Sequence, residues 1–493
     1  MNDNRHPHAH RTPESARSQG TKRRVSGSGA GTRRTNGSGT QRRTASPNSG
    51  YVFHAGEARR SPNMRPKQRV TALTPAEQKK LMKREQREVE EREKEKAWQN
   101  EVVRVHGRID VFMLVIILIL LALGSITVFS ASYPLAVSEG RESNYYIVKQ
   151  LQFLALGGSV MLFEILFLPI DFFKNKFVVF GAYFVSMMLL IYTFFKGNAQ
   201  GEAVRWVRIG PVNVQPSELM KVSLVLMLAW YADRYKKQMK ELNLGFQSYL
   251  YNVGIPVVIL GGAAGFVLIG KHLSGTIIIG AIAVFMMIIA GCKILWLIET
   301  LVPIAIVGIG GFLIMNPYAL KRITTFTDEN ADTLDELYQT TQSLYAIGSG
   351  GLFGVGLGES RQKYSYLTQA HTDFIFSIWC EEWGFIGAVA LIALFTLFIW
   401  RGYVIAMRAP DKFTMLTAFG ITTHVGLQAF LNMCVASDLI MNTGITLPFF
   451  SYGGSSLVVL MMEMGILLSI SRQYYRKKSD IEREKMIKNL GMD

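Results

Sequence analysis

The side chains most able to do chemistry lie in one long polar stretch, residues 321–373, between two strongly apolar segments. Its first half is acidic and holds Asp328, Glu329, Asp332, Asp335 and Glu336. A carboxylate there could remove a proton from an attacking hydroxyl group or bind a divalent metal ion. Its second half holds further polar candidates, namely Gln339, Gln342, Ser349, Lys363, His371 and Asp373. Connections this long and this rich in ionisable groups are usually functional.

Glycines lie among these polar residues and suggest a flexible backbone. They are Gly348, Gly350, Gly351, Gly354, Gly356 and Gly358. Because glycine adopts conformations closed to other residues, we expect this segment to be able to close over a ligand.

A second group of candidates precedes an apolar segment that begins near residue 217. Glu218 and Lys221 are three residues apart, so they share one face of a predicted helix. Charge that faces lipid is costly, and we therefore expect both to point into the bundle or into a polar cavity. They either take part in chemistry or form a structural ion pair. Arg205 and Arg208 suit phosphate recognition or, alternatively, anchoring at the membrane interface.

A third group lies near the end of the chain, in the stretch Asn442–Ser456, which is rich in glycine and hydroxyl groups. Ser451 and Ser455 belong to it. Such a stretch between two apolar segments either lines a cavity with non-helical backbone or forms a tight turn. Four ionisable residues inside apolar segments are expected to be internal hydrogen-bond partners: Glu164, Glu299, His424 and Glu463.

The elements that must position these groups are membrane-spanning helices. The chain has 493 residues, of which 49% are hydrophobic and only 18% charged. Uncharged runs such as 111–133 match the roughly twenty residues needed to cross a bilayer. We predict an all-α polytopic membrane protein with ten spans: 111–133, 146–168, 176–195, 217–235, 250–269, 274–291, 293–315, 377–400, 413–434 and 452–471.

Basic residues concentrate on alternate connections between these spans. They are Lys174, Lys176, Arg234, Lys236, Lys237, Lys240, Lys293, Arg401, Arg408 and Lys412. By the positive-inside rule both termini are cytoplasmic and the large loop 321–373, between spans seven and eight, is extracytoplasmic. ATP is absent there, so the chemistry must use an energised substrate. The net charge of +16 is then a topology signal and does not indicate nucleic acid. The three cysteines, without a CxxC pair, are expected to be packing residues.

Composition divides the chain into four parts. Residues 1–67 lack the aliphatic side chains for a core and are expected to be a disordered, basic cytoplasmic tail. Residues 68–110 contain a capping box, Thr74 to Glu77, and a mixed-charge run, which predicts a juxtamembrane helix or, alternatively, an arm that binds a partner or anionic lipid. Residues 111–472 form the ten-helix domain, and 473–493 form a cytoplasmic tail.

Four ordered motifs in residues 110–472 resemble the SEDS family (shape, elongation, division, sporulation) of bacterial cell-wall polymerases. They are Arg205-Trp206 with Gln215-Pro216-Ser217-Glu218-x-x-Lys221; Tyr338-Gln339-x-x-Gln342-Ser343 with Ala346 to Gly351; His371-Thr372-Asp373-Phe374-Ile375-Phe376; and Ser451-Tyr452-Gly453-Gly454-Ser455-Ser456. Residues 356–363 are more similar to the division and sporulation branch (FtsW, SpoVE) than to the elongation branch (RodA). Two departures, at Gly270-Lys271 and at Met441, bear on the subfamily and not on activity.

The resemblance implies a peptidoglycan glycosyltransferase that polymerises lipid II on the outer face of the bacterial cytoplasmic membrane, at the division septum. It implies that Asp332, six residues before Tyr338, is the essential aspartate, with Glu218, Lys221 and Arg205 at the family's other positions. The substrate-binding residues implied by the motifs are Arg205, Gln339, Gln342, Ser349, Lys363, His371, Asp373, Ser451 and Ser455. The implied partners are lipid II, a monofunctional class B penicillin-binding transpeptidase and other divisome proteins. A divalent metal ion at Asp332 is left open.

Two other functions remain open at this point. A ten-span protein with internal charges could instead flip lipid II across the membrane, although no inverted half-repeats are evident. The chain could also be a non-catalytic scaffold of the division machinery, using its long tail. Polymer formation by the purified protein distinguishes the enzyme from both.

Overall fold

The computed structural model describes residues 76, 79, 82–84, 86, 87, 89–93, 102–196, 198–200, 203–210, 212–240, 245–315, 320, 338–442 and 444–489. The chain divides into two units, Met1–Gln78 and Lys79–Asp493, and every labelled helix and strand belongs to the second. The predicted tail, residues 1–67, and the acidic stretch that contains Asp332 lie outside the described residues.

Long helices dominate the second unit. They are α2 (Val111–Ser138), α3 (Tyr145–Phe167), α5 (Lys176–Lys196), α6 (Pro216–Arg234), α9 (Ile255–Ile269), α10 (Leu273–Ala290), α11 (Ile294–Met315), α14 (Ile375–Arg408), α15 (Lys412–Ala436) and α16 (Gly454–Ser471). Helix α9 continues a span that starts with α8 (Phe246–Tyr249) and the π-helical turn η1 (Leu250–Gly254). Short helices are α4 (Ile170–Lys174), α7 (Lys236–Lys240), α13 (Tyr338–Ser349) and α17 (Lys478–Asn489).

Within the described part of the chain, nine helices are long and apolar enough to cross a membrane. The predicted tenth, α6, has 19 residues and packs against α5, α10 and α15, but it carries Glu218, Lys221, Asp233 and Arg234. These charges make α6 less apolar than its neighbours. The predicted polytopic, helical membrane fold is confirmed, and each predicted span coincides with one helical segment.

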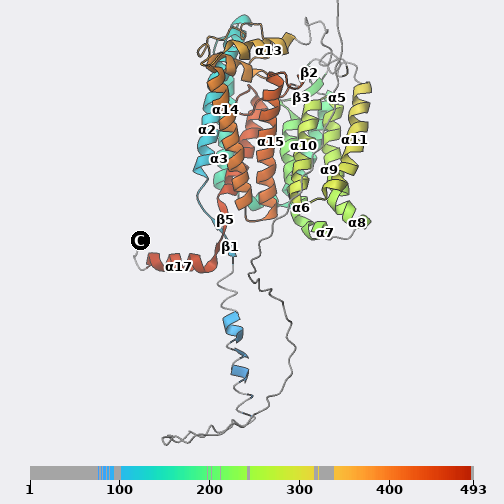
Figure 1. Ribbon diagram of the computed structural model, residues 1–493, viewed down its shortest axis with the longest axis vertical. Helices are drawn as coiled ribbons and strands as arrows, with labels where there is room; N and C mark the ends of the chain where they lie inside the picture. The colour runs from blue at the N-terminus through green and yellow to red at the C-terminus, as the bar shows by residue number, and fades with distance from the viewer. Residues whose placement is uncertain are drawn as a thin grey trace, which may run out of the picture. The chain divides into compact units, whose positions relative to one another are not determined.

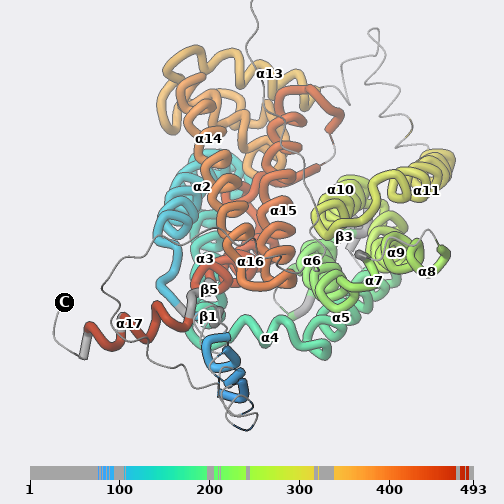
Figure 2. The backbone as a smooth tube through the Cα atoms, turned by 60° about the horizontal axis from the view of Figure 1, so that its bottom comes forward, coloured from blue at the N-terminus to red at the C-terminus, as the bar shows by residue number. Residues whose placement is uncertain are grey.

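Helix α15 lies between two groups of helices (Figures 1 and 2). It contacts α14 and α16 on one side, where α2 and α3 also pack, and α6 and α10 on the other, where α5 and α9 pack. Of the apolar window in α15, 72% is buried, against 6% in α11, which lies at the periphery. The polar side chains of α15 are therefore enclosed by protein, as charged and polar groups at membrane depth require.

Two small sheets lie at opposite ends of this bundle (Figure 1). Strands β2 (Asn198–Gln200), β3 (Ala203–Ile209) and β4 (Val212–Val214) form an antiparallel sheet at the end that also carries α13, which we call the α13 end. At the other end β1 (Val102–His106) pairs antiparallel with β5 (Gln473–Lys477). Residues 102–106 were expected to be helical, and that expectation is wrong. Arg104 pairs with Tyr475, 371 positions later, and local sequence does not reveal such a tertiary contact.

Helix α14 is broken at Gly384, which has φ 67° and ψ −165°. The loop that follows α13 fills the break, because Phe385 N donates to Gly351 O (2.9 Å) and Ile386 N donates to Leu352 O (3.2 Å). In return Val355 N donates to Glu381 O at 3.0 Å. The loop therefore supplies hydrogen-bond partners for backbone groups at the break.

Gly384→Ala is expected to lower the thermal stability of the protein. Its backbone conformation is one that is essentially restricted to glycine and costs other residues of order 1–3 kcal/mol. An added Cβ would also lie 2.3 Å from Gly354 N, a backbone atom that cannot move without displacing the loop. The matched control is Gly158→Ala in α3, where a Cβ would meet nothing within 4 Å. Equal melting temperatures of the two variants in detergent would contradict the expectation.

Candidate functional site

The start of α6 places Glu218 and Lys221. Pro216 occupies the first turn, where its missing N–H is harmless, and Glu218 follows where the helix dipole favours a carboxylate. Lys221 Nζ lies 2.7 Å from Glu218 Oε2, and both side chains are buried. The expected inward-facing pair is present. Its role in chemistry stays a prediction.

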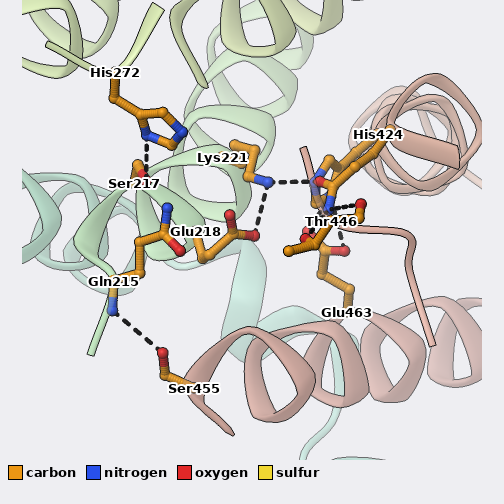
Figure 3. Close-up of polar contacts among 10 residues, drawn as sticks. Gln215, Ser217, Glu218, Lys221, His272, His424, Thr446, Ser455 and Glu463 are labelled. Carbon is orange, nitrogen blue, oxygen red and sulfur yellow. Dashed lines mark hydrogen bonds and ion pairs between the residues drawn. The ribbon is translucent and has the colours of Figure 1, made fainter. Parts of the chain in front are cut away.

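Lys221 also connects α6 to α15 (Figure 3). Its Nζ donates to Gln428 Oε1 at 2.7 Å. Gln428 Nε2 donates to Thr446 O and Thr446 Oγ1, both at 3.1 Å. These contacts fix the orientation of the Gln428 amide, because a flipped amide would place its NH₂ group, a donor, against the Lys221 ammonium, also a donor.

The fixed amide determines where protons lie on His424. His424 Nε2 is 2.9 Å from Gln428 Oε1, an atom that can only accept, so Nε2 must carry a hydrogen. His424 Nδ1 faces both oxygens of Glu463, at 2.9 and 3.0 Å. One further proton is therefore held between His424 and Glu463. The buried chain from Glu218 to Glu463 is continuous and hydrogen-bonded at every link, as a polar network in a low-dielectric interior must be.

A cavity lies beside this chain. Its polar lining comes from α6, α15, α16 and the connection between α15 and α16, and consists of Glu218, His424, Gln428, Thr446, Ser451 and Ser456. Residues 446–451, which belong to no helix, therefore contribute to the cavity wall, as the first of the two interpretations predicts.

Gly444 brings two motif residues together at the α13 end. A Cβ on Gly444 would lie 3.3 Å from Arg205 Nη1 and 3.4 Å from Asp373 Oδ2. Gly444 also has a positive φ of 68°, which favours glycine. Strand β3, the end of the large loop and the connection between α15 and α16 thus converge at Gly444.

Buried serines fasten these connections to each other. Ser451 Oγ donates to Thr372 O (2.6 Å) and accepts from Leu447 N (2.7 Å). Ser455 Oγ accepts from Gln215 N at 3.2 Å. His371 O accepts from Tyr452 N at 2.9 Å. Ser451 and Ser455, predicted to bind substrate, are engaged in holding the site together.

The pKa values of His371 and Asp373 are shifted in opposite directions. Burial lowers the pKa of His371 to about 4, with Glu139 opposing the shift. Burial raises the pKa of Asp373 to about 6, with Arg205 opposing. Both shifts act in favour of the neutral form, as expected where charge is poorly solvated.

His371→Gln and Asp373→Asn are expected to change the pH dependence of stability in opposite ways. Between pH 4 and 6.5 unfolded His371 binds more protons than folded His371, so its contribution stabilises as pH rises. Between pH 3.8 and 6 folded Asp373 binds more protons, so its contribution is lost as pH rises. Melting temperatures in detergent should fall with pH in His371→Gln and rise in Asp373→Asn, relative to wild type. Parallel profiles of all three proteins would contradict both assignments.

Other predicted site residues lie elsewhere. Gln339, on α13, accepts from Asn442 Nδ2 at 2.9 Å, and Ser349 is exposed at the end of that helix. Gln342 is half-buried on the same helix. Lys363 is buried and donates to Ser130 Oγ (2.9 Å), Gly358 O (2.6 Å) and Glu382 Oε1 (3.1 Å). The structure thus places Lys363 in an internal ion pair, away from the cavity. Asp332 lies outside the described residues.

The glycine cluster also differs from expectation. A Cβ on Gly350 would lie 2.2 Å from Cys380 O, and one on Gly354 would lie 2.1 Å from Glu382 O. These glycines allow close packing on α14, so the idea that they form flexible backbone able to close over a ligand is wrong for them.

Gln428 and His272 were not predicted from the sequence, whereas Thr446 lies in the stretch that was predicted to line a cavity. His272 Nδ1 lies 3.2 Å from Ser217 Oγ, next to the pair on α6. Of the four ionisable residues expected to bond internally, His424 and Glu463 do so with each other. Glu164 is buried, but its Oε2 has no hydrogen-bond partner, so the expectation does not hold for that atom. Glu299 is exposed on α11, so the expectation is wrong for it. A polar amide within an apolar span was the available signal for Gln428.

No group of three or more His, Cys, Asp or Glu side chains that could hold a metal ion occurs among the residues the structure describes. The three cysteines are free and buried, in agreement with their predicted packing role.

Known proteins are similar to this chain in sequence and in fold. Stage V sporulation protein E of Bacillus subtilis (strain 168) is 36% identical over 74% of this chain and 97% of its own length. A probable peptidoglycan glycosyltransferase FtsW of Geobacter sp. (strain M18) is 35% identical over 75% of this chain and 98% of its own. Two solved structures cover 74% of this chain. The rod shape determining protein RodA of Thermus thermophilus has TM-score 0.53, 26% identity and 97% of its length covered. A chain of a peptidoglycan synthase complex has TM-score 0.58, 24% identity and 98% covered.

The family model described as a cell cycle protein, which groups FtsW, RodA and SpoVE, matches residues 111–476. That range contains all ten long helices and all four motifs. The chain belongs to the FtsW/RodA/SpoVE family.

Proposed function

We propose that this chain is a peptidoglycan glycosyltransferase that polymerises lipid II into glycan strands for septal cell-wall synthesis. One observation supports this most strongly. Glu218, paired with the buried Lys221, lines a cavity, and Arg205 and Asp373 converge on Gly444 at the α13 end. In the sequence Asp332 lies six residues before the start of α13. The names of the FtsW relatives support the activity.

The reaction forms a bond between a sugar 4-hydroxyl oxygen and an anomeric carbon, and breaks the bond from that carbon to a lipid pyrophosphate. Asp332 accepts the hydroxyl proton as general base. Arg205 pairs with the departing pyrophosphate through its planar guanidinium. Lys221 supplies a second fixed positive charge near the cavity, and Glu218 holds it there.

Gln428, His424 and Glu463 act behind Lys221. Gln428 Oε1 accepts hydrogen bonds from both Lys221 and His424. The Lys221 ammonium group is therefore held between Gln428 on one side and Glu218 on the other. A charge held in place before the reaction needs no reorganisation during it, which is the source of electrostatic catalysis.

The experiment that tests this function is polymerisation of purified lipid II by the purified protein, with and without a cognate class B penicillin-binding transpeptidase. The similar structure from a peptidoglycan synthase complex supports such a partner. Glycan polymer, separated by electrophoresis, is the expected product. Lipid II scrambling across vesicles without polymer would favour a transporter, and neither activity would favour a scaffold.

The chemistry requires the α13 end to be extracytoplasmic, with both termini in the cytoplasm. A cysteine at Glu336 should therefore react with an impermeant thiol reagent in intact cells, and a cysteine at Lys237, exposed on α7, should react only after permeabilisation. The native cysteines are buried, so wild type gives the background. Reversed labelling would contradict the orientation and, with it, the proposed function.

A further inference from the structure

An exposed apolar cluster lies outside the cavity, where the loop after α13 meets the break in α14. Its members are Leu352 (55% exposed), Phe353 (77%), Val355 (42%), Phe385 (63%) and Ile386 (50%). Large apolar side chains in water are unfavourable, and such patches mark binding surfaces. What covers this cluster depends on its depth relative to the membrane.

Two ion pairs give that depth, because they connect α2 and α14 at two levels. The Lys363–Glu382 pair is buried, and the Arg401–Asp110 pair is partly exposed. Near the β1–β5 sheet, Arg401 Nη2 donates to Asp110 Oδ2 at 2.6 Å. At the α13 end, Ser130 Oγ donates to Glu382 Oε1 at 2.5 Å, and Lys363 Nζ joins them.

The distance between the two pairs equals the thickness of a bilayer core. At 1.5 Å per residue, α2 rises about 30 Å from Asp110 to Ser130, and α14 rises about 28 Å from Arg401 to Glu382. The hydrocarbon core of a bilayer is about 30 Å thick. Arg401 and Asp110 are partly exposed (22% and 11%), so we expect this pair at one boundary of the core. The level of Glu382, about 28–30 Å away along α2 and α14, then lies at the other boundary.

The loop after α13 extends below the Glu382 boundary. Ile386 N donates to Leu352 O at 3.2 Å, so Leu352 lies level with Ile386. Ile386 is one turn deeper than Glu382, about 6 Å into the core. Phe353, the most exposed member of the cluster, is the next residue.

We propose that Gly351–Val355 is a re-entrant wedge whose Leu352 and Phe353 side chains insert among lipid acyl chains at the α13 end. The backbone meets the requirement for such a position, because non-helical segments at membrane depth need their polar groups satisfied. Gly351 O, Leu352 O and Val355 N are all bonded to α14. The tight glycines, Gly354 and Gly384, bring the two backbones close enough for these bonds.

The wedge fixes the large loop to the membrane surface. It anchors the segment between α13 and Lys363 at two points, one in lipid and one at the Glu382 ion pair. This role does not rest on the proposed chemistry. A helix of a partner protein is the alternative occupant of the same patch. A measurement on the purified protein in lipid, where no partner is present, distinguishes the two.

The test uses spin labels on single added cysteines in the full chain, reconstituted in nanodiscs of phosphatidylethanolamine and phosphatidylglycerol. Phe353→Cys and Leu352→Cys probe the wedge. Glu142→Cys, exposed beyond the end of α2, is the aqueous control. The native cysteines are buried, and wild type treated with the label gives the background.

For labels at 352 and 353 we expect collision with oxygen to exceed collision with a water-soluble nickel chelate several-fold, and the reverse at 142. Reading both positions guards against a local effect of one substitution. If the labels at 352 and 353 collide with the nickel chelate as the label at 142 does, the patch stands in water and the wedge is refuted. A partner protein would then be its occupant.

Discussion

Asp332→Asn is expected to abolish polymer formation from lipid II while leaving expression and partner binding unchanged. The substitution is nearly isosteric and removes only the negative charge and the ability to take a proton. A positioned general base contributes about a hundredfold to ten-thousandfold in rate, so residual activity should be at most about 1% of wild type. The measurement is the initial rate of glycan formation by purified protein.

Asp335→Asn and Asp328→Asn are the matched controls, because they remove the same charge within the same loop. Both should retain substantial activity, since the spacing to Tyr338 assigns the essential position to Asp332. Loss of activity in Asp335→Asn with an active Asp332→Asn would show that the assignment is shifted by three residues. Activity in all three variants would exclude a carboxylate base at these positions.

Lys221→Met and Glu218→Gln are each expected to destabilise the protein and to abolish activity. Removing one member of a buried pair leaves an uncompensated charge, which costs about 3–5 kcal/mol. The double variant Glu218→Gln/Lys221→Met removes both charges and should recover much of the stability. It should not recover polymerisation, because the fixed positive charge at the cavity is gone.

The second buried pair provides the control. Lys363 and Glu382 are also enclosed, but they lie away from the cavity. Lys363→Met/Glu382→Gln should therefore keep activity once the protein is folded. The measurements are the melting temperature and the polymerisation rate of both double variants. Full activity in Glu218→Gln/Lys221→Met would show that the α6 pair serves stability alone.

The sequence by itself determined the helical membrane fold, the ten segments and the membership of a family. Each depends on information that is local in the chain. A span is about twenty consecutive apolar residues, and a motif is a short run of residue types in a fixed order. The Glu218–Lys221 contact was also predictable, since three residues on one helix bring the side chains together.

Only the tertiary structure decided which distant side chains meet. Lys221 and Gln428 are 207 positions apart, and His424 and Glu463 are 39 apart. Membrane helices are apolar on nearly all sides, so their sequence does not show which face meets which neighbour. For the same reason Lys363 was predicted at the substrate but lies in an ion pair with Glu382, and the glycines predicted to be flexible pack against α14. Their roles depend on how α14 bends at Gly384, and that bend is stabilised by a loop from another part of the chain.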